Sequence, residues 1–195
     1  MSTTLPAAAA GLPASNPLAR PSTLPFGAPP FDRLKDTDFQ PAIEAGMHAE
    51  RAEYKSIADD AAPPSFDNTI VAMERAGQLL ARANTIFQNL VSANSDATLQ
   101  KVNEEEAPRL QAHSDAILLD PKLFRRIRTL YESRDALGLD PAQKFLLGRY
   151  YTRFVRAGAL LSNADKARLR VINTEIAKLQ TRFRDRLQAA TKAAA

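Results

Sequence analysis

The chain has 195 residues, of which 45% are apolar and 25% are charged, and its formal net charge is +4. This balance is typical of one soluble globular domain with its own core. No run approaches the roughly 20 consecutive apolar residues that a membrane-spanning helix needs, so we expect no membrane partner. The sequence contains no cysteine, which excludes disulfides, zinc–cysteine sites and thiol catalysis. Because a cysteine-free chain fits a reducing compartment, we expect a cytoplasmic protein.

Charge is distributed unevenly along the chain. Residues 1–121 carry 9 Lys and Arg against 16 Asp and Glu, whereas residues 122–195 carry 17 against 6. The first part therefore has a net charge of −7 and the second a net charge of +11. The two halves can attract each other or present separate faces to partners, and the sequence leaves both uses open.

Residues 1–30 are rich in proline and alanine, and seven of the 13 prolines lie there. Each proline fixes φ and removes a backbone donor, so we expect an extended or disordered leader that lies along a surface. Phe26 and Phe31 flank Pro29-Pro30, and we expect both rings to be buried at the end of this leader. The remaining residues, 31–195, are expected to form a helical segment.

From Asp36 onward the apolar spacing is helical, and the alternation typical of strands is missing, so we predict an all-α fold of about six helices in an irregular bundle. The first helix is expected over residues 38–60. The second is expected over residues 66–93, with Ser65 as its cap. The third is expected over residues 97–119.

Two details are predicted for this third helix. Its N-cap is expected among Asn94, Ser95 and Asp96, and Pro108 is expected to kink it. Its apolar content is thin, so we expect it to lie on the outside of the bundle with Leu99, Val102, Leu110 and Ile117 turned inward.

Two Asp-Pro pairs mark the next helix starts. Asp120 and Asp140 each offer an N-cap side chain, and each is followed by proline at the first helical position. We therefore predict helices over residues 121–137 and 141–159, with Gly138 as a left-handed residue between them. The second of these helices is apolar on more than one face, so we expect it to be the most enclosed.

The last helix is expected to begin after Ser162 or Asn163 and to run to the end of the sequence at Ala193–Ala195, inside a helical pattern that suggests truncation. Its apolar residues recur every three or four positions: Leu169, Ile172, Ile176, Leu179, Phe183 and Leu187. This row predicts a long amphipathic helix that contacts other helices. Tyr150, Phe154 and Phe183 are predicted to be packing residues.

No set of residues points to catalysis. His48 has Glu44 one turn before it, and His113 precedes Asp115, but neither has a second histidine at metal-binding spacing. We therefore predict no catalytic, cofactor-binding or metal-site residue in this chain.

Three other groups were candidates for a site. Adjacent residues on a helix point about 100° apart, so the carboxylates of Glu104-Glu105-Glu106 are expected to form a solvated face. The arginines alternate with residues at core spacing, so we expect no nucleic-acid partner; they are Arg125, Arg126, Arg128, Arg182, Arg184 and Arg186. Tyr150-Tyr151 is interpreted as core packing with satisfied hydroxyls, and a ligand-facing aromatic pair is the alternative.

Several strings are more specific than composition: Asn16-Pro17-Leu18, Leu24-Pro25-Phe26, Pro29-Pro30-Phe31-Asp32, Phe66-Asp67-Asn68-Thr69-Ile70, Ala72-Met73-Glu74-Arg75-Ala76-Gly77 and Tyr150-Tyr151-Thr152-Arg153-Phe154-Val155-Arg156-Ala157-Gly158-Ala159. In this order they resemble the N-terminal region of bacterial peptidyl-dipeptidases of the Dcp type. These belong, with oligopeptidase A, to the thimet oligopeptidase family of zinc metallopeptidases.

The resemblance implies an all-helical zinc enzyme, several times longer than this chain, that releases dipeptides from the C-termini of short peptides. The family's His-Glu-x-x-His signature and its downstream glutamate match no position here. It further implies that these helices form one wall of the substrate channel, that the remainder of the polypeptide is their partner, and that zinc is held only by the full-length enzyme. We therefore expect the chain alone to be inactive and able to self-associate. A freestanding helical interaction module is the alternative.

Overall fold

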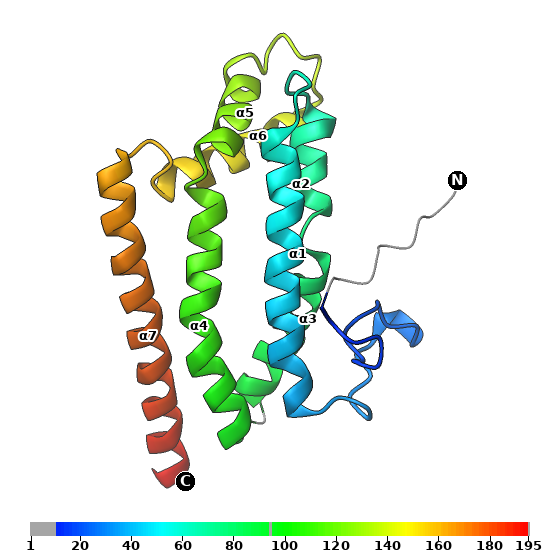
Figure 1. Cartoon of the computed structure of the whole chain (residues 1–195), viewed down its shortest axis with the longest axis vertical. Helices are drawn as coiled ribbons and strands as arrows, with labels where there is room; N and C mark the ends of the chain where they lie inside the picture. The colour runs from blue at the N-terminus through cyan, green and yellow to red at the C-terminus, as the bar shows by residue number, and fades with distance from the viewer. Residues whose placement is uncertain (1–10, 94, 195) are drawn as a thin grey trace. The chain divides into compact units, whose positions relative to one another are not determined.

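The computed structural model describes residues 11–93 and 95–194, and all regular structure in these ranges is helical (Figure 1). The predicted all-α fold is therefore confirmed. Residues 1–10 of the predicted leader, the candidate cap Asn94 and the last residue, Ala195, lie outside the described residues. No helix in the described ranges is both long enough and apolar enough to cross a membrane. The elements in chain order are η1 (Pro25–Gly27), η2 (Asp36–Asp38), α1 (Phe39–Asp59), η3 (Phe66–Val71), α2 (Ala72–Arg75), α3 (Gln78–Ala93), α4 (Ala97–Leu118), α5 (Pro121–Glu132), α6 (Pro141–Arg156) and α7 (Asn163–Ala194).

The predicted helix caps are present as hydrogen bonds. Asp120 Oδ1 accepts from the backbone amides of Lys122 and Leu123, both at 2.8 Å. Asp140 Oδ1 accepts from the backbone amide of Gln143 at 2.8 Å. Two serine hydroxyls accept in the same way, each at 3.1 Å. Ser65 Oγ, before η3, accepts from the backbone amide of Asn68, and Ser162 Oγ, before α7, accepts from that of Asp165. These side chains satisfy amides that the first helical turn leaves without an intrahelical partner.

The single helix predicted over residues 66–93 is interrupted. The chain forms a π-helical turn in η3, continues as α2, and then breaks at Ala76 and Gly77 before α3 begins. Gly77 has a φ of +73°, and a Cβ there would lie 2.2 Å from Oε1 of Glu50. The positive φ favours glycine at this position, which explains the break, whereas the Glu50 side chain could move away from a Cβ.

Two other helices end earlier than predicted. The helix expected over residues 121–137 ends at Glu132, and turns carry the chain to Gly138, whose φ of +66° confirms its left-handed conformation. The helix expected over residues 141–159 ends at Arg156. Helix α4 continues through Pro108 as one element.

The chain divides into two compact units, and each is built from segments that are not contiguous in sequence. Unit 1 comprises Met1–Glu50, Gly77–Ala107 and Gln180–Ala195, and unit 2 comprises Arg51–Ala76 and Pro108–Leu179. In unit 1, the rings of Phe39 and Phe87 lie 5.5 Å apart between centroids. A Cβ on Gly46 would lie 2.7 Å from Cα of Leu80, so α1 and α3 approach at backbone distance there.

Part of the predicted leader packs against unit 1. Leu12 and Leu18 are buried, and Nη2 of Arg82 donates a hydrogen bond to the Leu18 carbonyl at 2.9 Å. The expectation that Phe26 and Phe31 are buried is wrong, because Phe26 is fully exposed and Phe31 is 54% exposed. Phe26 has a φ of 60° in the tight turn η1, so leucines upstream of it, and not the rings, attach this segment.

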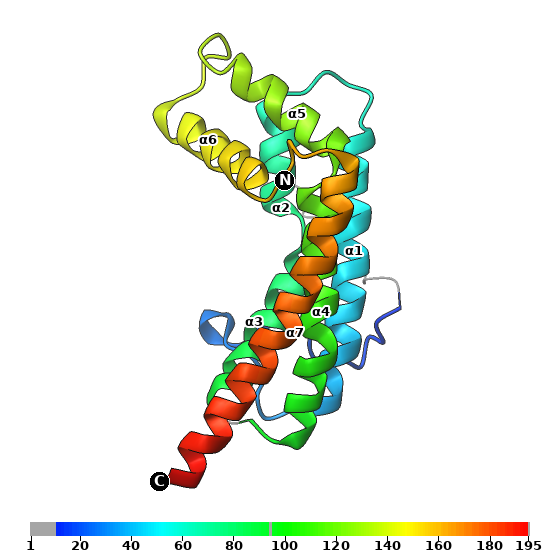
Figure 2. The ribbon, with the colours of Figure 1, turned by 90° about the vertical axis from the view of Figure 1, so that its left-hand side faces the viewer.

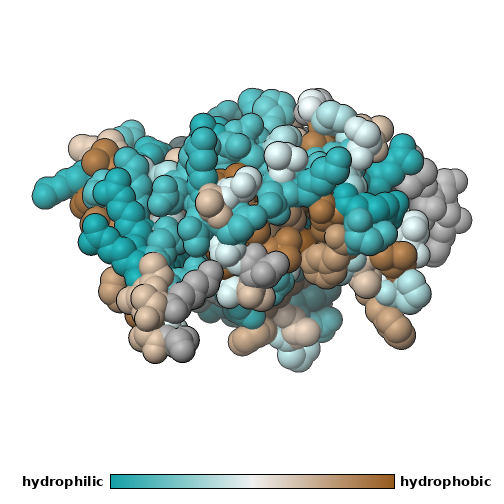
Figure 3. Space-filling view, turned by 90° about the horizontal axis from the view of Figure 1, so that it is seen from below, coloured by the Kyte–Doolittle hydropathy of each residue, from teal (hydrophilic) through white to brown (hydrophobic). Residues whose placement is uncertain are grey.

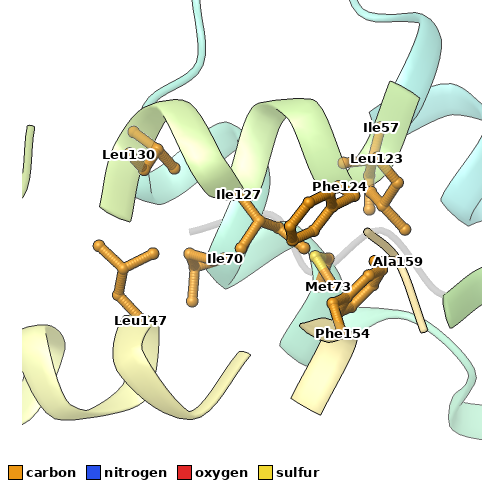
Figure 4. Close-up of a cluster of buried hydrophobic side chains, with 10 residues drawn as sticks. All are labelled: Ile57, Ile70, Met73, Leu123, Phe124, Ile127, Leu130, Leu147, Phe154 and Ala159. Atoms are coloured by element: carbon orange, nitrogen blue, oxygen red, sulfur yellow. The ribbon is translucent and has the colours of Figure 1, made fainter. Parts of the chain in front are cut away.

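The core of unit 2 gathers around α5 (Figure 4). Helices α5 and α6 pack against each other, as both ribbon views show (Figures 1 and 2). The prediction that α6 is the most enclosed helix is wrong, because only Leu147 and Phe154 of α6 are buried, whereas five residues of α5 are. The buried cluster consists of Ile57, Ile70, Met73, Leu123, Phe124, Ile127, Leu130, Leu147, Phe154 and Ala159.

Arg126, predicted only as part of an arginine group, is 6% exposed in unit 2. Its guanidinium donates to the carbonyls of Asp60 and Ala62 at 2.8 and 3.1 Å, to Asn68 Oδ1 at 2.9 Å and to Thr69 Oγ1 at 3.3 Å. A buried arginine is stable only when its donors are used, and here they join α5 to the segment before η3 and to η3 itself.

Of the residues of the third helix, α4, that were predicted to turn inward, Leu99 and Val102 are buried and Leu110 and Ile117 are half-buried, but the helix also buries polar residues, which was not expected. Its buried residues are mainly polar, and some of their hydrogen bonds come from distant side chains, such as Asn173 and Gln40, that the local pattern does not reveal. In unit 2, Asp115 Oδ1 accepts from Asn173 Nδ2 at 2.9 Å and from Gln111 Nε2 at 2.8 Å. The buried residues of α4 are Leu99, Val102, Asn103, Glu106, His113 and Asp115.

The apolar row of α7 is largely exposed. The prediction that Phe183 packs in the interior is wrong, since it is 67% exposed, whereas Lys166 and Thr181 of the same helix are buried. A space-filling view of one face shows apolar side chains, in brown, among polar ones, in teal (Figure 3). The exposed apolar residues of α7 are Val171, Ile172, Ile176, Leu179, Phe183 and Leu187.

Candidate functional site

The two histidines do not form a metal site. His48 is exposed on α1, and His113 is buried on α4 near Asp115. Among residues 11–93 and 95–194, no three His, Cys, Asp or Glu side chains are grouped so that they could hold a metal ion. The described residues therefore do not fit the zinc that the family resemblance implies.

The three consecutive glutamates do not form one solvated face. Glu104 and Glu105 are exposed, but Glu106 is fully buried, so this prediction is wrong for Glu106. Nε2 of Gln40 donates to Oε1 of Glu106 and to Oε2 of Glu105, both at 3.1 Å. This pairing belongs to the packing of unit 1.

The predicted aromatic pair divides between two environments, because adjacent helical residues point in different directions. Tyr151 stacks on Tyr131 with centroids 3.9 Å apart and lies 5.8 Å from the ring of Phe124. The guanidinium of Arg134 covers Tyr131 at 4.4 Å from the ring centroid. The packing interpretation is confirmed for both rings, which are partly buried against the core of unit 2, and Tyr151 is also part of an aromatic stack.

Tyr150 lies at the edge of a cavity. Its hydroxyl donates a hydrogen bond to Oε1 of Glu74 in α2. Burial, together with this hydrogen bond, raises the pKa of Tyr150 above its ordinary value. The ionisation of this side chain is therefore displaced further into the alkaline range, and its hydroxyl remains a donor to the Glu74 carboxylate.

This cavity, of about 900 Å³, is the best candidate site in unit 2. The face of α6 opposite its buried residues forms much of the lining. The residues of that face recur every three or four positions, which places them on one side of a helix. They are Phe145, Arg149, Thr152, Arg153 and Arg156. The lining residues are Glu74, Tyr131, Phe145, Leu146, Gly148, Arg149, Tyr150, Thr152, Arg153 and Arg156.

All the charged residues of helix α6 are basic. It contains Lys144, Arg149, Arg153 and Arg156 but no Asp or Glu. Lys144 is paired with Asp135 at 3.0 Å, outside the cavity lining. The three arginines, in contrast, all line the cavity. Such a surface attracts anions, and guanidinium groups match carboxylates in shape as well as charge.

Arg149, Arg153 and Arg156 were not among the candidate site residues predicted from the sequence. The arginines considered from the sequence are adjacent or two positions apart; of these, Arg126 is buried and structural, and Arg182 and Arg184 are exposed on α7. The helical spacing of the α6 arginines, combined with the absence of acidic residues from that helix, was the available signal.

Comparison with known proteins identifies relatives of this chain. No family model matches it. The dipeptidyl carboxypeptidase of Salmonella typhimurium is 41% identical over 179 residues, which are 92% of this chain and 26% of that protein. The dipeptidyl carboxypeptidase of Escherichia coli is 40% identical over 91% of this chain and 26% of its own length. The chain is homologous to the N-terminal quarter of dipeptidyl carboxypeptidase.

Oligopeptidase A is a more distant relative. The protein of that name from Salmonella typhimurium is 23% identical over 89% of this chain. A probable cytosolic oligopeptidase A from Arabidopsis thaliana is 23% identical over 91% of it. In each case the chain again spans about a quarter of the relative, with 26% and 25% of their lengths covered. The predicted resemblance is confirmed.

Proposed function

We propose that this chain is the N-terminal helical portion of a zinc-dependent peptidyl-dipeptidase and that it forms one wall of the channel that admits short peptides. The observation that supports this most strongly is the identity of about two in five residues to dipeptidyl carboxypeptidases over more than nine-tenths of the chain. In this proposal the chain supplies shape and charge to the channel. The remaining three quarters of the enzyme would hold the zinc, whose chemistry would be to activate a water molecule for attack.

The exposed apolar residues of α7 agree with a surface that another part of the polypeptide covers. Ile176 is 45% exposed and Leu179 is 54% exposed. An exposed apolar surface of this kind usually marks a contact with another protein surface, since removing apolar side chains from water is favourable. In the proposed enzyme, these residues contact the catalytic part, and the chain alone has no peptidase activity. The cysteine-free composition is compatible with a cytoplasmic enzyme.

A chimaera tests this proposal. The matching quarter of the Escherichia coli dipeptidyl carboxypeptidase is replaced by this chain, and release of dipeptides from a short peptide is measured. We expect the chimaera to be active and sensitive to a zinc chelator, whereas the Escherichia coli protein without that quarter is inactive.

The chain alone serves as the second measurement. We expect neither stoichiometric zinc nor chelator-sensitive hydrolysis from it. If the chimaera folds but is inactive, while the isolated chain is a stable monomer, the freestanding interaction module becomes the better account.

A further inference from the structure

We propose that the exposed face of α6 binds carboxylate groups of peptides through Arg149, Arg153 and Arg156. This inference rests on the proposed function for the choice of a peptide as ligand, but the site itself is defined by the residues that line the cavity of about 900 Å³ in unit 2. That volume lies within the range of about 300–1,000 Å³ that is typical of sites for small ligands.

The arginines of this face are available to a ligand. Arg149, Arg153 and Arg156 are exposed, and the side chains of Arg149 and Arg156 make no hydrogen bond or ion pair with other residues of the described ranges. The one carboxylate in the lining, that of Glu74, accepts a hydrogen bond from Tyr150. The lining thus contains three cations and one anion, which favours an anionic ligand.

The rest of the lining favours a peptide over a bare anion. Phe145 is 68% exposed beside the arginines, and Leu146 and Tyr131 add further apolar surface. A short peptide can place apolar side chains on this surface while a carboxylate meets a guanidinium fork in two parallel hydrogen bonds. Within a peptide, that carboxylate is either the C-terminus or an Asp or Glu side chain, and both offer the same chemistry.

Binding of labelled peptides to the 195-residue chain tests the proposal. We would use fluorescence anisotropy with an N-terminally labelled alanine-based hexapeptide in four forms, with either two glutamates or two glutamines inside it, and with either a free or an amidated C-terminus. We expect the glutamate peptide with a free C-terminus to bind most tightly. A weaker amidated form assigns the C-terminal carboxylate, and a weaker glutamine form assigns the side chains.

Matched variants separate this face from general basic charge. Replacing Arg149, Arg153 and Arg156 by Gln should weaken binding by about tenfold or more, because charge-assisted hydrogen bonds are lost. The control replaces three exposed arginines outside the lining by Gln, namely Arg125, Arg168 and Arg170, and carries the same change in charge. We expect this control to weaken binding by less than about twofold at moderate salt. Circular dichroism verifies that both variants fold.

Three results would overturn the proposal. One is equal weakening by the two triple variants, which would mean unspecific attraction. Another is no measurable binding of any of the four peptides. The third is tighter binding of a short RNA oligonucleotide than of the acidic peptide, with loss in the α6 variant, which would assign phosphate as the ligand. The chimaera described above does not depend on these outcomes, so failure here would leave the proposed function separately testable.

Discussion

Arg126 donates a hydrogen bond to Oδ1 of Asn68 at 2.9 Å, although the two residues are 58 positions apart. The same oxygen accepts from the backbone amide of Ser65 at 2.7 Å, and the Ser65 hydroxyl accepts from the amide of Asn68 at 3.1 Å. One amide oxygen therefore links the capping box of η3 to a buried cation on α5. The stability of this end of unit 2 should depend on that arginine.

Replacing Arg126 with Met should lower the free energy of unfolding by about 3 kcal/mol, because the carbonyls of Asp60 and Ala62 lose their donors. Denaturant unfolding followed by circular dichroism measures the change. Arg125→Met is the control, since Arg125 is exposed next to it and should change stability by less than about 0.5 kcal/mol. Equal effects of the two variants would contradict this structural role for Arg126.

Two glycines in helices should respond oppositely to alanine. A Cβ at Gly46 would lie 2.7 Å from Cα of Leu80, so Gly46→Ala should destabilise the chain by about 1–3 kcal/mol through overpacking. Apart from its chain neighbours and the backbone of its own helix, no atom lies within 4 Å of the corresponding position at Gly148 in α6, so Gly148→Ala should stabilise the helix by about 0.5–1 kcal/mol. Thermal melts of both variants decide the matter. A stabilising Gly46→Ala would show that α1 and α3 are further apart than described.

Two phenylalanines on α6 provide a test of which face is buried. Phe154 is 1% exposed within the core of unit 2, so Phe154→Ala should cost about 3–5 kcal/mol. Phe145 is 68% exposed, so Phe145→Ala should cost less than about 0.5 kcal/mol. Chemical unfolding of the two variants gives both values. Similar losses would mean that α6 is rotated about its axis.

The ionisation of Tyr150 should make the chain less stable in alkali. Burial and the bond to Glu74 raise its pKa in the folded chain, whereas an unfolded tyrosine ionises near pH 10. Its contribution to stability is fully present below that pH and is lost as the pH rises above it, because only the unfolded chain then releases the proton. Tyrosine absorbance should show one of the four tyrosines ionising late.

Tyr150→Phe is the matched variant for this titration. It should remove the late ionisation and flatten the alkaline fall in stability. A titration curve that keeps its late component in the variant would assign that component to another tyrosine.

The exposed part of α7 should cause self-association of the isolated chain. Ile176→Glu combined with Leu179→Glu should abolish it, since both side chains expose apolar surface that contact would bury. Sedimentation velocity over a wide range of concentration measures the association. Lys178→Glu changes an exposed, polar position on the same helix and should leave association largely intact. A strictly monomeric parent chain would refute this prediction.

Local chemistry explains which features could be predicted from the sequence. The caps at Asp120 and Asp140 bond to amides two or three positions away, so a short pattern contains all the information. The burial of Glu106 could not be predicted in this way, because its partner Gln40 is 66 positions distant. The spacing of apolar residues on α7 predicted a row correctly but not its direction, since a row shows which residues share a face and not what covers it.

The candidate site was partly predictable for the same reason. Arg149, Arg153 and Arg156 share a face by spacing alone. The pairing of Tyr150 with Glu74, by contrast, joins residues 76 positions apart. The cavity that both residues line depends on how α2 and α6 lie within unit 2, which no local pattern specifies.

The interleaving of the two units has a consequence for synthesis of the chain on the ribosome. Arg51–Ala76 leaves the ribosome before Gly77–Ala107 of the other unit, and its partners follow only in Pro108–Leu179. Proteins emerge N-terminus first, so the apolar residues Ile57 and Ile70 are synthesised before α5 and α6. Their core can form only after those two helices have emerged. The nascent chain therefore passes through a stage in which Ile57 and Ile70 lack the core partners from α5 and α6, and in that interval a chaperone that binds apolar segments would have its best access to them.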